Sequence, residues 1–168
     1  APTDYRSHKT ASDNSKSPAH VDIYYHCPQI SVAELFTDLK KLFPEEEFQF
    51  EAPSPELKLN ADRTQIEQVL INLLKNAREA CNRKLDKNIQ VKVKKLSAGN
   101  TALTISDNGE GILPDVLDKI FVPFFTTKTS GSGIGLSLCK QIMTLHEGSI
   151  NVKSESGKGS KFILTFPK

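Results

Sequence analysis

Asn72, Asn76 and Glu79 follow one another at spacings of four and three residues, which places them on neighbouring turns along one side of a helix. They border an apolar stripe at helical spacing: Ile66, Val69, Leu70, Leu73, Leu74, Ala77, Ala80 and Cys81. Amide oxygens are suitable ligands for Mg²⁺, and the border of a buried stripe is where a cleft opens. Taken alone, the three side chains are also explained as ordinary half-exposed polar residues.

Residues 106–112 read Ser-Asp-Asn-Gly-Glu-Gly-Ile and directly follow an apolar strand pattern. Asp, Asn and Gly favour turns for backbone reasons, so a plain turn is one interpretation. The other is a binding loop, in which Gly109 and Gly111 let a flat ligand lie against the main chain. Asp107 would then accept a hydrogen bond from an exocyclic amine, favouring adenine over guanine, which presents a carbonyl at that position.

Gly131, Gly133 and Gly135 stand immediately before a predicted helix. Glycines there leave backbone N–H groups accessible, and a helix N-terminus favours an anion. The segment lacks the Gly-Lys-Ser/Thr of a Walker loop and the strand that precedes a Rossmann fingerprint. It indicates a phosphate-binding loop of another kind. Three phenylalanines before it are interpreted as core anchors: Phe121, Phe124 and Phe125.

Interleaved helices and strands must position these segments. A helix follows the capping box Ser31-Val-Ala-Glu34 and ends at Pro44, and Asp62 or Thr64 caps the long helix. Further helices are predicted after Pro114 and from about residue 135 to 146. Strands are predicted at 47–51, 57–60, 88–95 and 102–106, and on both sides of a turn at 156–160. We expect an α+β fold, a two-layer α/β sandwich in which about three helices cover one face of a mixed sheet of about five strands.

The composition excludes several classes of protein. The chain has 168 residues and a net charge of 22 − 20 = +2, so no broad basic field indicates nucleic acid or an anionic membrane. No segment approaches the roughly 20 apolar residues of a membrane span. Three cysteines at unrelated spacings match neither a zinc site nor a disulfide framework, which favours a reduced, cytoplasmic setting.

The beginning of the chain differs from the rest. Residues 1–20 contain no Leu, Ile, Val, Phe or Met, which predicts a disordered tail, a linker or a remnant of cloning. Residues 21–30 are interpreted as a connecting segment in which Ile23, Tyr24 and Tyr25 form a short strand. The domain itself is predicted to span 31–168.

The order of these motifs resembles the catalytic, ATP-binding domain of sensor histidine kinases, which share a superfamily with gyrase, heat-shock chaperone and mismatch-repair ATPases. Residues 72–80 match the N box, 107–111 the first glycine box and 121–125 the F box. Residues 131–136 match the second glycine box, and 155–162 match a terminal glycine box with Ser160 in place of the usual Thr. The resemblance spans about 31–167 and implies the Bergerat fold. The Phe-Phe-Thr-Thr-Lys segment resembles the subgroup of nitrogen-regulation sensors.

This resemblance implies ATP and Mg²⁺ as ligands and assigns roles to residues. Asn76 would ligate Mg²⁺, with Asn72 close to the phosphates or the metal. Asp107 would bind the adenine amine in a pocket shaped by Gly109, Gly111 and Ile112 and supported by Ser160. The residues between Gly111 and Gly131 would form a lid over the nucleotide, and residues 131–136 would cover the phosphates. The remaining expected ATP contacts come from the N box, the lid and this glycine loop: Lys75, Arg78, Thr126, Thr127, Lys128, Gly131, Ser132, Gly133, Ile134, Gly135 and Leu136.

Two positions depart from family patterns. Asn72 stands where gyrase-like members have a catalytic glutamate, and an amide cannot deprotonate water, which favours phosphoryl transfer over hydrolysis. Glu79 stands where some kinases have a lysine three residues after the metal-binding Asn, and Lys128 is the candidate substitute.

None of the four histidines fits the phosphoacceptor motif of the family: His8, His20, His26 and His146. We therefore expect a monomeric catalytic fragment that acts on a histidine-bearing dimerisation domain of the same kinase, followed by a response regulator. Direct contact with a membrane or nucleic acid is not expected. Two alternatives remain: a serine kinase of the same superfamily, such as an anti-sigma factor, and a nucleotide-binding regulatory module without turnover.

Overall fold

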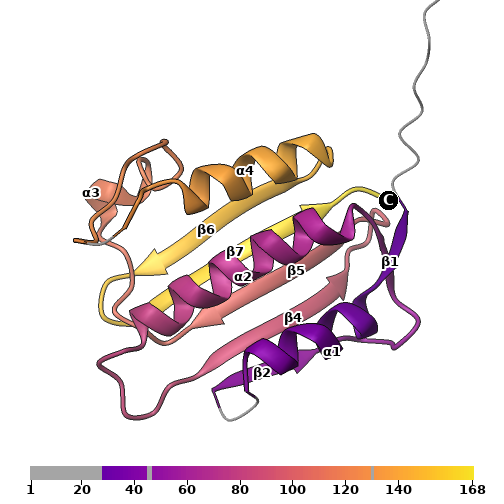
Figure 1. Cartoon of the computed structure of the whole chain (residues 1–168), viewed down its shortest axis with the longest axis horizontal. Helices are drawn as coiled ribbons and strands as arrows, with labels where there is room; N and C mark the ends of the chain where they lie inside the picture. The colour runs from indigo at the N-terminus through magenta and orange to yellow at the C-terminus, as the bar shows by residue number, and fades with distance from the viewer. Residues whose placement is uncertain (1–27, 45–46, 130) are drawn as a thin grey trace, which may run out of the picture.

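A sheet and a layer of helices make up the computed structural model, which describes residues 28–44, 47–129 and 131–168 (Figure 1). The helices are α1 (Val32–Leu42), α2 (Arg63–Ala80), α3 (Pro114–Leu117) and α4 (Gly135–Leu145). The strands are β1 (Gln29–Ser31), β2 (Phe48–Glu51), β3 (Lys58–Asn60), β4 (Ile89–Lys95), β5 (Thr101–Asp107), β6 (Ser149–Glu155) and β7 (Gly159–Phe166).

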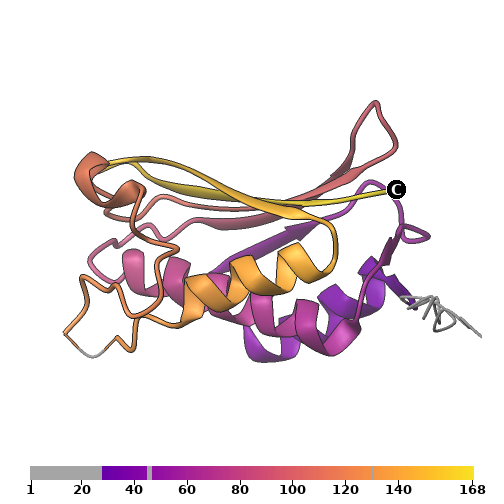
Figure 2. The same ribbon diagram turned by 90° about the horizontal axis from the view of Figure 1, so that it is seen from above.

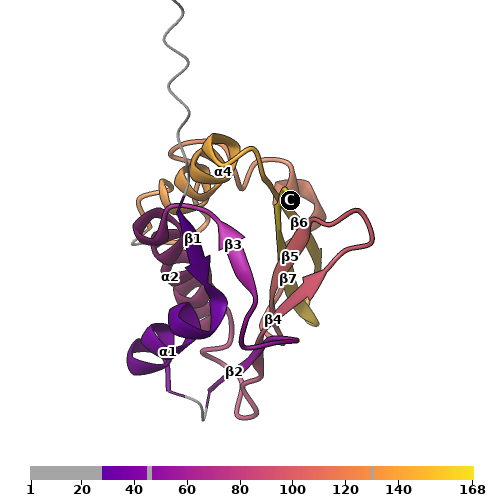
Figure 3. The same cartoon turned by 90° about the vertical axis from the view of Figure 1, so that its right-hand side faces the viewer.

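The main sheet has five strands in the order β2-β4-β5-β7-β6. β2 runs parallel to β4, and the other neighbours are antiparallel. Figures 2 and 3 show α1, α2 and α4 on one face of this sheet, while the single-turn helix α3 lies at one end. The predicted two-layer α+β sandwich with a five-stranded mixed sheet is therefore confirmed.

A smaller antiparallel pair joins β1 to β3 at the side of the helical layer. Ile30 pairs with Leu59, and both side chains are buried in the core. Residues 29 and 30 are therefore integral to the fold, which corrects the predicted boundary at residue 31. The predicted tail at 1–20 and the predicted strand around Tyr24 lie outside the described residues.

Local side-chain caps explain where the two long N-terminal helices begin. Ser31 Oγ accepts a hydrogen bond from the Glu34 N–H at 3.3 Å, as the capping box predicts. Asp62 Oδ1 accepts one from the Gln65 N–H at 2.9 Å, so Asp62 rather than Thr64 caps α2. The apolar stripe of α2 then faces the sheet, with Ile66, Leu70 and their neighbours on that stripe fully buried.

His146 joins the end of α4 to the beginning of α2. Its Nδ1 lies 2.8 Å from the Ile142 carbonyl oxygen, and its Nε2 accepts a hydrogen bond from the Asp62 N–H at 3.0 Å. A carbonyl only accepts and an amide N–H only donates, so the ring is neutral with its proton on Nδ1. This buried histidine therefore has a structural role.

Cys81 and Cys139 are free thiols buried in the core. Burial raises the pKa of both, that of Cys139 to about 12, so neither carries the thiolate of a reactive cysteine. Within the described ranges, no helix has both the length and the apolar character needed to cross a membrane.

Candidate nucleotide-binding site

Three residues of α2, spaced four apart, lie against three different segments of the predicted site: Asn72, Asn76 and Ala80. A Cβ built on Gly135 at the start of α4 would lie 3.5 Å from Asn72 Oδ1. The Lys128 ammonium lies 3.0 Å from Asn76 Oδ1. The Ala80 carbonyl accepts a hydrogen bond from the Glu110 N–H at 3.1 Å. Successive contacts are about 6 Å apart along the helix axis, so α2 aligns the three segments along one line.

Asp107 is the last residue of β5, and the loop that follows it packs on Ala80 at one end of this line. Its Oδ1 accepts a hydrogen bond from the Gly109 N–H at 2.9 Å, and its carboxylate also accepts one from the Ser160 backbone. Burial raises the pKa of Asp107, and these two hydrogen bonds oppose that shift in part. A carboxylate has about four lone-pair sites, so acceptor capacity remains for the amine of a base.

The two glycines of the Asp107 loop pack against the protein itself. A Cβ on Gly109 would lie 2.6 Å from the Ala80 carbonyl oxygen, and one on Gly111 would lie 2.2 Å from the Glu155 carbonyl oxygen. Gly111 also has a φ of +72°, which favours glycine. These contacts explain both glycines without a ligand, so the loop packs tightly between α2 and β6 and holds Asp107 in place.

Ser160 supports the same end of the site through Ser154. The two hydroxyl oxygens are 2.9 Å apart, and Ser154 Oγ accepts a hydrogen bond from the Ile112 N–H at 2.8 Å. Ser160 is buried, and it lies directly opposite Asp107 in the β5–β7 register. Ser160 therefore lies beside Asp107, and its supporting role toward a bound base stays a prediction.

The N-terminus of α4 lies at the other end of the line. Among the described residues, no side chain caps this helix with a hydrogen bond. Gly135 begins α4, and a Cβ built there meets only the Asn72 side chain at ordinary contact distances. Gly131 and Gly133 instead shape the loop, where Phe124 N–H bonds to the Gly133 carbonyl at 2.9 Å. The arrangement leaves a helix N-terminus facing the Asn72 amide, which suits an anionic group.

Lys128 connects the loop before α4 to α2. Its ammonium contacts both Asn76 Oδ1 and the Glu79 carboxylate. Two oxygens thus hold a cation at the position predicted for Mg²⁺, and amide and carboxylate oxygens are the ligands that this metal prefers. The donor set fits the ion. Sequence reasoning placed Glu79 on the same side of the helix as Asn76 but assigned the metal to Asn76 alone.

The other predicted contacts lie at different places. Lys75 is exposed on α2. It follows Asn72 by three residues and precedes Glu79 by four, so it neighbours both on the helix surface. The remaining predicted contacts in the lid and the glycine loop are exposed or half-buried: Thr126, Thr127, Ser132, Ile134 and Leu136.

Arg78 is not part of this group, which corrects the prediction of a phosphate contact. Its guanidinium lies 5.1 Å from the ring centre of Phe43 and 5.0 Å from that of Phe48. Its Nε is 3.2 Å from Glu47 Oε2. Arg78 follows Asn76 by two residues and so projects about 200° around the helix, toward α1 and β2.

A family model described as histidine kinase-, DNA gyrase B- and HSP90-like ATPase matches residues 61–168, more than half of the chain and all of the site described above. The chain belongs to this family. Within it, the chain is 41% identical over 110 residues to the sensor histidine kinase ZraS of Salmonella typhimurium, covering 66% of this chain. It is 42% identical over 116 residues to the C4-dicarboxylate transport sensor protein DctB of Rhizobium meliloti, covering 69% of this chain.

These relatives are much longer than the ATPase domain. The chain covers 23% of ZraS and 18% of DctB, so it corresponds to about a fifth of each. Among solved structures, the catalytic domain of histidine kinase ThkA is 35% identical with a TM-score of 0.73, covering 84% of this chain and 95% of that one. The predicted resemblance to the catalytic domain of sensor histidine kinases is confirmed.

Replacing Gly135 with Ala in this ATPase domain is expected to reduce ATP affinity without unfolding it. Ala is more favourable than Gly in a helix by roughly 0.5–1 kcal/mol, so stability should stay equal or rise slightly. The new methyl group would stand beside Asn72 at ordinary contact distance, in the space predicted for the phosphates, so ATP affinity should fall. Urea unfolding and ATP titration measure the two effects. Gly133→Ala is the contrast, because its φ of +70° and contact with Phe124 predict lost stability. Unchanged ATP affinity in Gly135→Ala would contradict the placement of the phosphates.

Arg78→Ala is expected to lower stability and leave ATP affinity unchanged. Two ring contacts and the packing of the side-chain stem are lost, at a cost of about 1–2 kcal/mol. Lys75→Ala on the site face should show the reverse pattern, with normal stability and weaker ATP binding. A fully stable Arg78→Ala protein with weakened ATP binding would instead show that Arg78 contributes to the ATP site.

Proposed function

We propose that the chain binds Mg-ATP and donates the γ-phosphate to a histidine on a separate dimerisation domain of a two-component sensor kinase. The observation that supports this most is the alignment along α2, with Asp107 at one end, Asn76 in the middle and the α4 N-terminus at the other. This order matches a nucleotide whose base and phosphates lie at opposite ends.

The chain's own residues account for binding and orientation. The Asp107 carboxylate accepts a hydrogen bond from the adenine amine, and the first N–H groups of α4 bind phosphate oxygens. Asn76, with Glu79 next to it, would hold Mg²⁺, which neutralises charge on the β- and γ-phosphate oxygens when bound. Asn72 stands between the metal position and α4, where its amide orients the phosphates.

The residue at position 72 favours transfer to a protein acceptor over hydrolysis. An amide does not take a proton from water, so the site has no general base at this position. A neutral imidazole is already nucleophilic and needs no such base. A bond forms between its nitrogen and the γ-phosphorus, the bond from that phosphorus to the β–γ bridging oxygen breaks, and ADP leaves.

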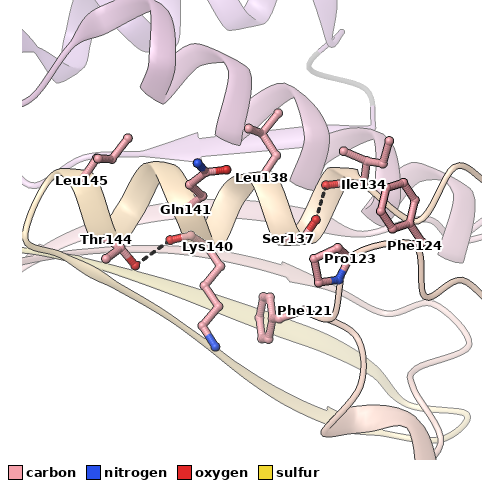
Figure 4. Close-up of a pocket in the computed structure, with 10 residues that line it drawn as sticks. All are labelled: Phe121, Pro123, Phe124, Ile134, Ser137, Leu138, Lys140, Gln141, Thr144 and Leu145. Atoms are coloured by element: carbon pink, nitrogen blue, oxygen red, sulfur yellow. Dashed lines mark hydrogen bonds between the residues drawn. The ribbon is translucent and has the colours of Figure 1, made fainter.

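An apolar groove beside α4 is the proposed docking face for the acceptor domain. Figure 4 shows Phe124 beside Ile134 at the start of α4, with Phe121 and Pro123 along the side of the helix that bears Ser137 and Lys140. The pocket that these residues help to line has a volume of about 570 Å³. Phe124 is 76% exposed, so the interpretation of this residue as a core anchor was wrong. The groove reaches Ile134 at the start of α4, so a helix bound there would bring its histidine close to the γ-phosphate.

A response regulator is the proposed next partner. A solved structure contains histidine kinase ThkA in complex with the response regulator protein TrrA. The kinase in it is 31% identical to this chain with a TM-score of 0.67, and the match covers 84% of this chain and 41% of that one. Because a kinase needs the ATP that the cytoplasm supplies, we place this domain in the cytoplasm.

A transfer assay with γ-labelled ATP tests the proposal. The chain is mixed with the histidine-bearing domain of its own kinase or with the same domain carrying His→Gln. We expect label on the first domain only, stable in alkali and lost in acid. Acid-stable label would support the serine-kinase alternative, and tight ATP binding without any label would support the regulatory module.

A further inference from the structure

Lys128 makes the contact that joins the tip of the lid to α2. Its ammonium lies 3.0 Å from Asn76 Oδ1 and forms an ion pair with Glu79. These partners are 52 and 49 residues away in the sequence. Local bonds hold the backbone of Lys128 in a turn: its N–H bonds to Thr126 Oγ1 at 3.0 Å, and its carbonyl accepts from the Gly131 N–H at 3.3 Å.

The ammonium and a metal ion compete for one oxygen. Asn76 Oδ1 is the atom that the proposed function assigns to Mg²⁺, which binds oxygen at about 2.0–2.1 Å. Two cations cannot share that oxygen at such distances without strong repulsion. Metal binding at Asn76 therefore requires that Lys128 leave. A lysine side chain moves easily, since its charge sits on a flexible four-carbon stem.

Glu79 determines how readily Lys128 leaves. Its carboxylate attracts the ammonium and, if left unpaired, repels nucleotide phosphates. Metal-free ATP brings only negative charge and must draw Lys128 away from Glu79. Mg-ATP brings a cation that replaces the ammonium at Asn76 and lies next to Glu79, so both oxygens keep a positive partner.

We propose that Lys128 is an exchangeable latch, which holds the lid tip on α2 through Asn76 and Glu79 and moves to the phosphates when Mg-ATP binds. Glu79 is the residue that makes release of this latch depend on the metal. The proposal rests on the proposed function for the identity of the ligand. The contact between lid and helix in the free protein does not depend on that function.

Hydrogen exchange of the nucleotide-free protein tests the latch directly. Glu79→Gln and Lys128→Met should each speed amide exchange at residues 126–129, and the double variant should exchange no faster than Lys128→Met. The matched control is Glu51→Gln, which breaks an exposed ion pair to Lys92 of 3.1 Å at a remote strand edge and should leave the lid unchanged. Unchanged exchange in Glu79→Gln overturns the latch even if the protein binds no ATP.

ATP titrations with and without Mg²⁺ test the coupling to the metal. Glu79→Gln should raise affinity for metal-free ATP about two- to fivefold, the range for one exposed ion pair, and change Mg-ATP affinity less. Removing a negative charge also strengthens ATP binding through space, so the same substitution is repeated in Lys128→Met. The gain should disappear there if it acts through the latch, and a gain that persists contradicts the proposal. Absence of any ATP binding by the parent protein counts against the proposed function instead.

Discussion

Asn76→Ala should reduce phosphoryl transfer to the acceptor histidine by at least about 100-fold. The substitution removes the amide oxygen that lies in the middle of the site and holds the Lys128 ammonium at 3.0 Å. Loss of metal-held charge stabilisation costs several kcal/mol in the transition state, and about 2.7 kcal/mol corresponds to 100-fold in rate. Initial rates with γ-labelled ATP and saturating acceptor domain measure the effect.

Folding does not confound this test. Asn76 is half-buried at the border of the α2 stripe, and Ala is the best helix former. Asn82→Ala, an exposed amide just after α2, is the matched control and should transfer phosphate normally. A folded Asn76→Ala protein that retained more than a tenth of the parent rate would contradict the proposed role of Asn76 in holding the metal for phosphoryl transfer.

Asp107→Asn should weaken ATP binding about 10- to 100-fold and reduce the preference for ATP over GTP. Asn keeps one oxygen, which the Gly109 N–H occupies in the parent at 2.9 Å, and its amide nitrogen then faces the donor amine of adenine. Loss of a hydrogen bond to a charged group is worth about 1.5–3 kcal/mol. Parallel ATP and GTP titrations measure both changes. Undiminished ATP affinity would contradict the adenine-binding role.

The same substitution should change how the stability of the domain depends on pH. Burial raises the pKa of Asp107 in the folded state, so the folded protein binds this proton more tightly than the unfolded chain does. The contribution of Asp107 to stability is therefore fully present below its unfolded pKa of about 3.9 and is lost as pH rises through the folded value. Between the unfolded and the folded pKa of Asp107, the stability of Asp107→Asn relative to the parent should rise with pH. Above the folded pKa, this difference should stay constant. Urea unfolding as a function of pH gives this difference.

Local signals in the sequence were sufficient for most elements of the fold. Ser31 and Asp62 cap helices because their side chains reach the first free N–H groups, a short-range effect that depends on residue type. The apolar stripe of α2 predicts a buried face because its period matches the helix. The strand at 57–60 was predicted and corresponds to β3, but β1 and its pairing with β3 were missed, because a three-residue strand with one buried apolar residue carries almost no periodic signal.

The site was predictable where one helix determined the geometry. Asn72 and Asn76 share a side of α2 by rotation alone, and the same rotation of about 100° per residue excludes Arg78, which motif matching had included. The contact between Lys128 and Asn76 joins residues 52 apart in the sequence and depends on how the lid folds over α2, so no local pattern predicted it. The packing of Gly109 against Ala80 likewise depends on tertiary structure.

A crystal structure of the domain with Mg²⁺ and a non-hydrolysable ATP analogue tests the central claim most directly. We predict the adenine amine within hydrogen-bond distance of the Asp107 carboxylate, the cation on Asn76 Oδ1, the phosphates at the N-terminus of α4, and the Lys128 ammonium moved from Asn76 to a phosphate. A base bound away from Asp107, or a cation coordinated without Asn76, would contradict the account.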